Sequence, residues 1–344
     1  MQDVKTIYRR RTARAQALMR EAGIDLLLLA PSSNLRYLTG LSSKPDERLQ
    51  LCLLPAEGAA QFILPTLYRL QTQEALDDQH VVYVADGVSP QESLSRLAWG
   101  NPRRVALEET MRASHLLLLL PYLRNAELLE AQTVLRALRM YKEPQEIDAV
   151  KAASEIVDAA AGEILSHLTP GVTERNTAFL LEQLCKENGA EELSFSANVS
   201  FGASAAEPHH RPGAQALMKN TFVLMDFGAK RDGYCSDITR TVCFGRATEE
   251  MRRVYDTVLA ANRAAFASVR PGLRCEEIDR AARKVICDAG YGDFFIHRTG
   301  HGLGLDVHEE PYIVEGNECL LEEGMIFSIE PGIYLPGRFG VRIE

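Results

Sequence analysis

A faint internal repeat in the second half of the chain is the feature that most constrains its fold. Pro170-Gly171-Val172 precedes a predicted helix that ends at Gly189, and Pro271-Gly272-Leu273 precedes one that ends at Gly290. Both glycine-to-glycine distances are 18 residues, and a predicted long helix precedes each unit. Because repeats fix architecture, we expect two copies of one supersecondary unit that close into a pseudo-symmetric domain.

The first 140 residues have a different pattern, in which strand-like and helical segments alternate. These segments are predicted helices at 5–22 and 113–120 and predicted strands at 24–30, 51–55, 61–64 and 81–84. Such alternation indicates a compact α/β domain. Lys142-Glu143-Pro144 marks the start of a further helix, since proline is favoured at the first helical position. We therefore predict two domains, residues 1–140 and 141–344.

Composition argues against several classes of protein. The longest apolar stretches, Leu26–Ala30 and Leu116–Leu120, are far shorter than the ~18 residues of a membrane helix. The basic residues 9–11 are not followed by the apolar segment of a signal peptide, so we expect a soluble, cytoplasmic protein without a membrane partner. A net charge of −9 argues against a nucleic-acid partner. The seven cysteines are scattered without a C-x-x-C pair, which argues against disulfides and a thiolate zinc site.

Acidic residues occupy matching positions in the two repeat units. Each unit contains a strand-like segment that ends in an acidic residue followed by x-Gly, with Asp226 in the first and Glu330 in the second. A hairpin turn centred on residues 231 and 232 would put Asp226 opposite Asp237. A turn centred on Gly337 would put Glu330 opposite Glu344.

Two such pairs would form a cluster of four carboxylates. Directly opposed residues on antiparallel strands have Cβ atoms only ~4.5–5.5 Å apart, so like charges there repel each other. A pair of bound divalent ions is the simplest compensation, and carboxylates with few imidazoles favour Mn²⁺ or Co²⁺ over a thiolate zinc site. The alternative is that each acidic residue faces solvent on an ordinary hairpin.

Five of the eight histidines follow residue 200, and two of them frame the glycine-rich segment 300–311. His301 is the natural nitrogen ligand. His308 is then a free imidazole near the metals, suited to stabilising charge on a substrate oxygen. The chain lacks the H-E-x-x-H, G-x-S-x-G and Walker motifs of other enzyme classes.

At these residues the sequence resembles the pita-bread metallopeptidases of family M24, which include methionine aminopeptidase, aminopeptidase P and prolidase. The matching segments are residues 225–241, 297–311, 322–334 and 340–344. Residues 22–40 are similar to the creatinase-type N-terminal domain that accompanies the proline-directed members. The resemblance therefore implies an α/β creatinase-type domain, an α+β pita-bread catalytic domain, and cleavage of the bond before proline.

The resemblance also implies a metal centre. Its ligands would be Asp226, Asp237, His301, Glu330 and Glu344, with Asp237 and Glu344 bridging two divalent ions. Mn²⁺ is expected, with Co²⁺ or Zn²⁺ as alternatives. A metal-bridging water or hydroxide would act as the nucleophile. Similar proteins continue for a short strand beyond the last ligand, so we expect either further residues after Glu344 or a weakened metal affinity.

The remaining roles follow from the same resemblance. Glu330 would pass a proton between water and the leaving nitrogen, and His308 would stabilise the tetrahedral intermediate. His209 is implied as a catalytic, substrate-binding histidine, and His297 would line the substrate pocket. The residues expected to orient the acidic ligands are Tyr234, Thr239 and Arg342.

We interpret the chain first as an Xaa-Pro dipeptidase (prolidase), because its N-terminal domain is short and G-H-G-L-G…H-E has a prolidase-like form. Aminopeptidase P, which acts on longer peptides, is the close alternative. An alternative of another class is a metal-free pita-bread domain used for binding, against which the five intact ligands argue. A dipeptidase must recognise a free carboxylate, and the loop 42–48 could supply Arg48 for this purpose. Relatives with this N-terminal domain commonly form dimers, so a homodimer is expected.

Overall fold

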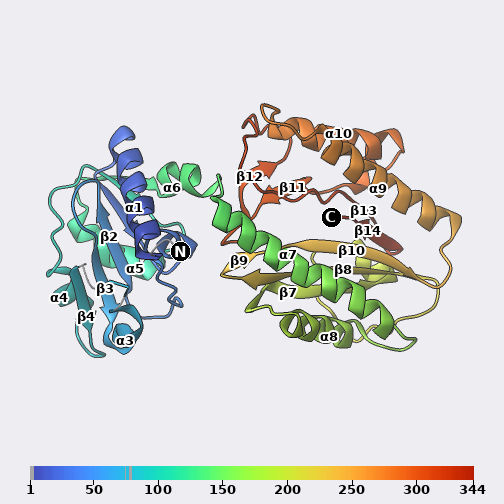
Figure 1. Ribbon diagram of the computed structural model, residues 1–344, viewed down its shortest axis with the longest axis horizontal. Coiled ribbons are helices and arrows are strands. Elements are labelled where there is room, and N and C mark those ends of the chain that lie inside the picture. The colour runs from blue at the N-terminus through green and yellow to red at the C-terminus, as the bar shows by residue number, and fades with distance from the viewer. Residues whose placement is uncertain (1–3, 74, 77–79) are drawn as a thin grey trace. The chain divides into compact units, whose positions relative to one another are not determined.

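The computed structural model describes residues 4–344, except residues 74 and 77–79 (Figure 1). The chain divides into two compact units, Met1–Arg139 and Met140–Glu344. Within the described residues, no helix has both the length and the apolar character needed to cross a membrane.

The N-terminal unit contains one six-stranded mixed sheet with the strand order β4-β3-β2-β1-β5-β6. Its strands are β1 (Leu26–Leu29), β2 (Leu51–Pro55), β3 (Gln61–Pro65), β4 (His80–Val84), β5 (Arg104–Leu107) and β6 (Glu127–Glu130). Its helices are α1 (Val4–Glu21), α2 (Ser33–Thr39), α3 (Arg69–Thr72), α4 (Pro90–Leu94), α5 (Ala113–Leu119) and α6 (Gln132–Arg139). The central strand β1 is a continuous run of four buried leucines, as expected for a strand covered on both faces. The predicted α/β architecture is confirmed.

The C-terminal unit has four long helices and several antiparallel ladders. Its helices are α7 (Pro144–Ile164), α8 (Glu174–Glu187), α9 (Glu249–Ser268) and α10 (Cys275–Asp288). Its strands are β7 (Glu192–Phe201), β8 (Thr221–Arg231), β9 (Tyr234–Cys235), β10 (Ile238–Phe244), β11 (Gly300–Gly302), β12 (Glu309–Ile313), β13 (Gly332–Leu335) and β14 (Phe339–Arg342). Strands β10, β8 and β7 form one sheet with β9 attached to β8, while β11 pairs with β12 and β13 with β14. A short 3-10 helix, η4 (Gly202–Ala206), follows β7.

The internal repeat is visible in the backbone of this unit. Gly171 N–H donates to the Leu217 carbonyl at 2.9 Å, and Gly272 N–H donates to the Leu321 carbonyl at 2.8 Å. These equivalent bonds precede α8 and α10, which have 14 residues each. Each half also has its own hydrophobic core: one includes side chains of α7, α8, β7 and β8, and the other includes side chains of α9, α10, β13 and β14. The predicted duplication is therefore present in both hydrogen bonding and packing.

The register of the first hairpin differs from the prediction. Asp226 on β8 pairs with Thr239 on β10, not with Asp237. The predicted direct opposition of the two aspartates is wrong by two residues. Because side chains alternate with a period of two, this shift leaves both aspartates on the same face, as diagonal neighbours.

The position of the turn explains the shift. Arg231 and Tyr234 are paired, so the turn consists of Asp232 and Gly233 alone. Both turn residues have positive φ, 51° and 81°, which is the requirement of a two-residue type I′ turn and the reason for the Asp-Gly preference. The turn centre thus lies one residue further along the chain than predicted.

The register of the second hairpin is confirmed. Gly332 pairs with Arg342 and Leu335 with Phe339, which places the centre of symmetry at Gly337 as predicted. Extending this register puts Glu330 opposite Glu344, with both residues just outside the paired strands.

Candidate metal centre

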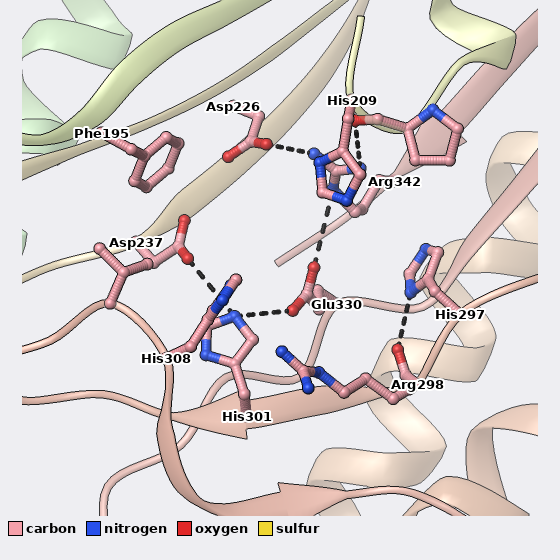
Figure 2. Close-up of a pocket in the computed structure, with 12 residues that line it drawn as sticks. Phe195, His209, Asp226, Asp237, His297, Arg298, His301, His308, Glu330 and Arg342 are labelled. Atoms are coloured by element: carbon pink, nitrogen blue, oxygen red, sulfur yellow. Dashed lines mark hydrogen bonds and ion pairs between the residues drawn. The ribbon is translucent and has the colours of Figure 1, made fainter. Parts of the chain in front are cut away.

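A cavity of about 660 Å³ in the C-terminal unit collects side chains from both halves of the repeat (Figure 2). It is lined by Phe195, Pro208, His209, Asp226, Asp237, His297, Arg298, His301, Val307, His308, Glu330 and Arg342. The acidic and imidazole groups come from β8, β11, the segments that flank β10, β11 and β13, and the segment between η4 and β8. The sequence-distant motifs therefore meet in one place.

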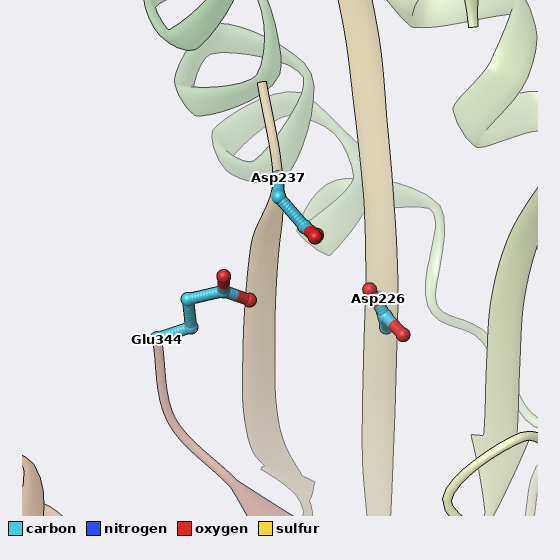
Figure 3. Close-up of side chains that lie close together, drawn as sticks. All are labelled: Asp226, Asp237 and Glu344. Atoms are coloured by element: carbon cyan, nitrogen blue, oxygen red, sulfur yellow. The ribbon is translucent and has the colours of Figure 1, made fainter. Parts of the chain in front are cut away.

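Three carboxylates form the centre of this group (Figure 3). Asp226, Asp237 and Glu344 each offer one oxygen, and these oxygens all lie within 4.8 Å of one another. Asp237 Oδ1 and Glu344 Oε1 are buried and have no hydrogen-bond partner among the described residues. Buried polar atoms are normally satisfied, so two unsatisfied anionic oxygens in one cluster fit a cation site.

His301 and Glu330 complete the group. His301 Nε2 lies 3.2 Å from Glu330 Oε1 and 3.6 Å from Asp237 Oδ2. His301 Nδ1 lies 3.0 Å from the Gly302 carbonyl, an arrangement in which Nδ1 carries the proton and Nε2 is left as the ligating nitrogen. The structure thus brings together all five side chains predicted as metal ligands. Carboxylates plus one imidazole form a donor set suited to divalent ions such as Mn²⁺.

The electrostatics of the cluster reflect the concentration of negative charge. Burial, together with neighbouring carboxylates, raises the pKa of Asp237 and of Glu344 well above the ordinary range. Burial also acts to raise the pKa of Glu330. The hydrogen bond and charge of His301, together with Arg342, outweigh that effect and lower this pKa. Divalent cations would offset the repulsion within such a cluster.

Arg342 and Thr239 join the cluster to its surroundings. Arg342 Nη2 pairs with Asp226 Oδ2, and its Nε donates to Thr239 Oγ1 at 2.9 Å. Thr239 Oγ1 donates to Glu344 Oε2 at 3.1 Å. These contacts connect carboxylates from both halves of the repeat, and the orienting role of Arg342 and Thr239 stays a prediction.

His297 is engaged at both ring nitrogens. Its Nε2 lies 2.8 Å from Tyr334 Oη, and its Nδ1 lies 2.7 Å from the Arg298 carbonyl. The Arg298 carbonyl can only accept, so Nδ1 carries the proton of the neutral imidazole, and Nε2 accepts from the Tyr334 hydroxyl, which itself accepts from Arg342. Burial lowers the pKa of His297, in keeping with this neutral form. His297 therefore presents ring carbon atoms rather than a free nitrogen to the cavity.

His308 and His209 also line the cavity (Figure 2). The ring of His308 packs edge-on against that of His301, with a centroid separation of 4.1 Å. Burial and the neighbouring His301 lower the pKa of His308 to about 4, so its imidazole is neutral at pH 7 and can donate one N–H. His209 follows Pro208, whose carbonyl accepts from Asn198 Nδ2 at 3.0 Å and thereby holds this part of the loop against β7.

The hydrogen bonds and ion pairs described for two other predicted site residues do not involve the acidic cluster. The Tyr234 hydroxyl donates to Glu146 Oε1 at 2.8 Å, at the start of α7. The Arg48 guanidinium belongs to the N-terminal unit, where Arg48 Nε lies 2.8 Å from Asp86 Oδ1 and Nη1 lies 2.8 Å from Glu47 Oε1. Their predicted roles, an orienting contact for Tyr234 and a carboxylate clamp for Arg48, stay predictions.

Sequence reasoning missed a buried carboxylate that anchors the loop of His209. Glu174, at the start of α8, accepts hydrogen bonds from the backbone N–H groups of Phe201 and Gly213. Its carboxylate also contacts Ser204 Oγ, and His210 Nε2 at 2.8 Å. Against the opposing effect of burial, these hydrogen bonds lower the pKa of Glu174. The only sequence signal was its place just after Pro170-Gly171-Val172, where it reads as an ordinary acidic residue in the first turn of a helix.

Family models match both units of the chain. Residues 148–344 match the model of metallopeptidase family M24, and residues 11–141 match the creatinase/prolidase N-terminal domain.

Individual relatives match nearly the whole chain. A probable dipeptidase PepE of Mycobacterium tuberculosis is 40% identical over 342 residues, which cover 98% of this chain and 91% of that protein. An Xaa-Pro dipeptidase of Lactobacillus delbrueckii subsp. lactis is 36% identical over 339 residues, which cover 96% and 91% of the respective chains. The crystal structure of a recombinant prolidase from Thermococcus sibiricus has a TM-score of 0.93 at 40% identity and covers 98% and 92%.

Proposed function

The chain belongs to metallopeptidase family M24, and we propose that it is a metallopeptidase that hydrolyses the Xaa-Pro bond of dipeptides. The observation that carries this proposal is the convergence of Asp226, Asp237, Glu330 and His301 at one cavity, with Glu344 next to the two aspartates. Two buried carboxylate oxygens of this cluster are unsatisfied among the described residues. Relatives named as Xaa-Pro dipeptidase and prolidase support the choice of substrate.

We propose that this cluster holds two divalent metal ions, Mn²⁺ first among them and Co²⁺ or Zn²⁺ as alternatives. The residues that would hold these ions are Asp226, Asp237, His301, Glu330 and Glu344. Among them, Asp237 and Glu344 have carboxylate oxygens that are unsatisfied within the described residues. When bound, such ions supply Lewis acidity and lower the pKa of a water molecule at the site.

The chain's own residues carry the proton and orient the groups. Glu330 lines the cavity beside His301 Nε2, within reach of a bound substrate. It moves the proton from the attacking water to the leaving nitrogen. The neutral His308 donates its N–H to the developing negative charge on the substrate carbonyl oxygen. His209 contacts the substrate from the loop anchored by Glu174, and His297 shapes the cavity wall through its ring carbons.

Recognition of a dipeptide also requires a contact to its free carboxylate. Arg48 is the residue proposed for this contact. Loss of a charge-assisted hydrogen bond in Arg48→Ala should raise the KM for Ala-Pro by about tenfold or more. An unchanged KM would remove Arg48 from the proposal without affecting the metal centre. A cytoplasmic location and a homodimer remain predictions from the sequence.

The decisive test is Mn²⁺-supplemented hydrolysis of Ala-Pro beside Ala-Pro-Ala, with a metal-stripped sample as control. Metal-dependent cleavage of Ala-Pro alone supports the proposal. Preference for Ala-Pro-Ala would assign the alternative, an aminopeptidase P that releases the first residue of longer peptides. A protein that binds no metal and cleaves neither peptide would instead favour a binding module.

A further inference from the structure

A side chain on α9 lies at the base of the second acidic hairpin. Asn262 Nδ2 donates to the Ile329 carbonyl at 2.7 Å and to the Ile343 carbonyl at 3.1 Å. These two residues directly precede Glu330 and Glu344. A side-chain amide has two N–H groups, so one asparagine can serve both carbonyls. Asn262 therefore ties together the two chain segments that carry the second pair of carboxylates.

The backbone of the hairpin holds these segments only weakly by itself. The ladder of β13 and β14 ends at the pair Gly332–Arg342, so both glutamates lie beyond it. The next inter-strand bond, from Ile343 N–H to the Pro331 carbonyl, is long at 3.4 Å. Positioning of the two glutamates thus depends on contacts from other elements.

Asn262 is hydrogen-bonded to the peptide groups that join Ile329 to Glu330 and Ile343 to Glu344. Since a peptide group is planar, holding the Ile329 carbonyl also sets the direction of the Glu330 N–H, which donates to the Thr299 carbonyl at 2.7 Å. The Ile343 carbonyl and the Glu344 N–H likewise belong to one peptide group. This N–H donates to the Thr239 carbonyl at 3.4 Å. Each peptide group is held on both sides, and Asn262 is the group that the two have in common.

We propose that Asn262 is a positioning residue of the metal centre, which sets the separation of Glu330 and Glu344 through the carbonyls of Ile329 and Ile343. This inference rests on the proposed metal centre. Metal sites tolerate errors of only about 0.2 Å in ligand distance. A glutamate side chain has more rotatable bonds than an aspartate, so its backbone must be held well if its carboxylate is to stay within that tolerance.

The test is Mn²⁺ binding to metal-stripped protein, measured by calorimetry for the wild type, Asn262→Ala and Asn262→Asp. Loss of an outer contact of this kind should raise the Mn²⁺ Kd about tenfold or more in both variants. The aspartate is informative because its added negative charge would by itself tighten cation binding, while it loses the amide donors. If Asn262→Ala does not fold, Asn262→Asp carries the comparison alone.

Asn188→Ala is the matched control. Asn188 is also half-buried, and its Nδ2 donates to the Leu184 carbonyl at 3.0 Å at the end of α8, away from the acidic cluster. Weaker Mn²⁺ binding in both Asn262 variants, with wild-type affinity in Asn188→Ala, supports the proposal. An affinity within about twofold of wild type in the Asn262 variants, or tighter binding in Asn262→Asp, overturns it. Failure of the wild type itself to bind Mn²⁺ overturns the proposed metal centre instead.

Discussion

Asp226 lies inside the paired strands β8 and β10, whereas Glu330 and Glu344 lie beyond the last pair of β13 and β14. The two halves of the C-terminal unit thus share a plan of helices and hairpins but place their acidic residues differently relative to the ladder. Within a ladder the strand register determines where a carboxylate points. Outside it, the carboxylate depends on side chains of other elements.

The hydrogen bonds behind the acidic residues run in opposite directions in the two halves. In the first half the segment between β9 and β10 donates to a helix, from Ser236 Oγ to the Ala153 carbonyl of α7 at 3.0 Å. In the second half a helix donates to the segments next to β13 and β14, from Asn262 to the two isoleucine carbonyls. Ser236 and the isoleucines all directly precede an acidic residue of the cluster. In both halves, therefore, the residue that precedes an acidic residue is held by a hydrogen bond to a helix. The two halves differ in whether the helix accepts or donates that bond.

The largest expected effect comes from removing one acidic ligand in either half. Asp237→Asn and Glu344→Gln should each lower kcat/KM for Ala-Pro by about a thousandfold, because a metal site contributes several kcal/mol to transition-state stabilisation. Each should also raise the Tm of the metal-stripped protein, since a neutral amide replaces one of the crowded, buried carboxyl groups. Steady-state kinetics and thermal unfolding measure both. If only one variant lost activity, the halves would not share one centre.

Two glycines at equivalent positions should differ in their tolerance of a side chain. A Cβ at Gly228 would lie 2.1 Å from the Ser236 carbonyl oxygen, while a Cβ at Gly332 would meet the Tyr334 side chain at 2.7 Å. The clash at Gly228 is closer and is with backbone, so Gly228→Ala should lower the free energy of unfolding by about 3 kcal/mol and Gly332→Ala by about 1 kcal/mol. Urea unfolding of the two variants distinguishes them. Equal losses would contradict the rigid-register description of the first half.

Glu174 is a support that only the first half has, because the equivalent position of the second half is Cys275. Glu174→Gln should lower the free energy of unfolding by about 2 kcal/mol at pH 7, since several hydrogen bonds to a charged carboxylate are weakened. The folded state lowers the pKa of Glu174, so this stability is present above the unfolded pKa of ~4.3 and is lost as pH falls through the folded pKa. The difference between wild type and variant should therefore shrink on acidification below about pH 4. A difference that stays constant down to acidic pH would exclude the charge as its cause.

The smallest expected effect is that of Ser236→Ala. Ser236 is fully buried, and its hydroxyl is worth about 1 kcal/mol of stability. Because Asp237 is flanked directly by β9 and β10, which both pair with β8, the Mn²⁺ Kd should change by less than about twofold, in contrast to the Asn262 variants. Calorimetry of Ser236→Ala and Asn262→Ala side by side measures the contrast. Equal weakening of Mn²⁺ binding would show that both halves rely on such donors.

The sequence predicted much of the fold because its signals are local and periodic. The first helix, predicted at 5–22, is α1 (Val4–Glu21), and the predicted strand at 51–55 is β2. The duplication was readable because Pro-Gly and a distant glycine delimit each copy. The five proposed ligands could be grouped because each lies in a motif that matches the family.

The register of the first hairpin and the roles of Asn262 and Glu174 were not predicted from the sequence. The Asp232-Gly233 dipeptide is the preferred sequence of a type I′ turn, so the sequence contains a local signal for the observed register of the first hairpin. Asn262 and Glu174 have no such signal. Each acts on chain segments that the fold brings to it from far along the sequence, and an asparagine or glutamate on a helix is indistinguishable from a solvated one by pattern alone.

The two-residue turn at Asp232-Gly233 also has a consequence for changes in chain length. Exposed turns between strands are usually where proteins accept insertions and deletions. Here one extra residue absorbed by β10 would exchange the two faces of that strand, so that Asp237 would point away from Asp226. Although Asp232 is exposed, the length of this turn is therefore fixed by the acidic cluster. Insertions and deletions at this turn should be tolerated far less than those in other surface loops.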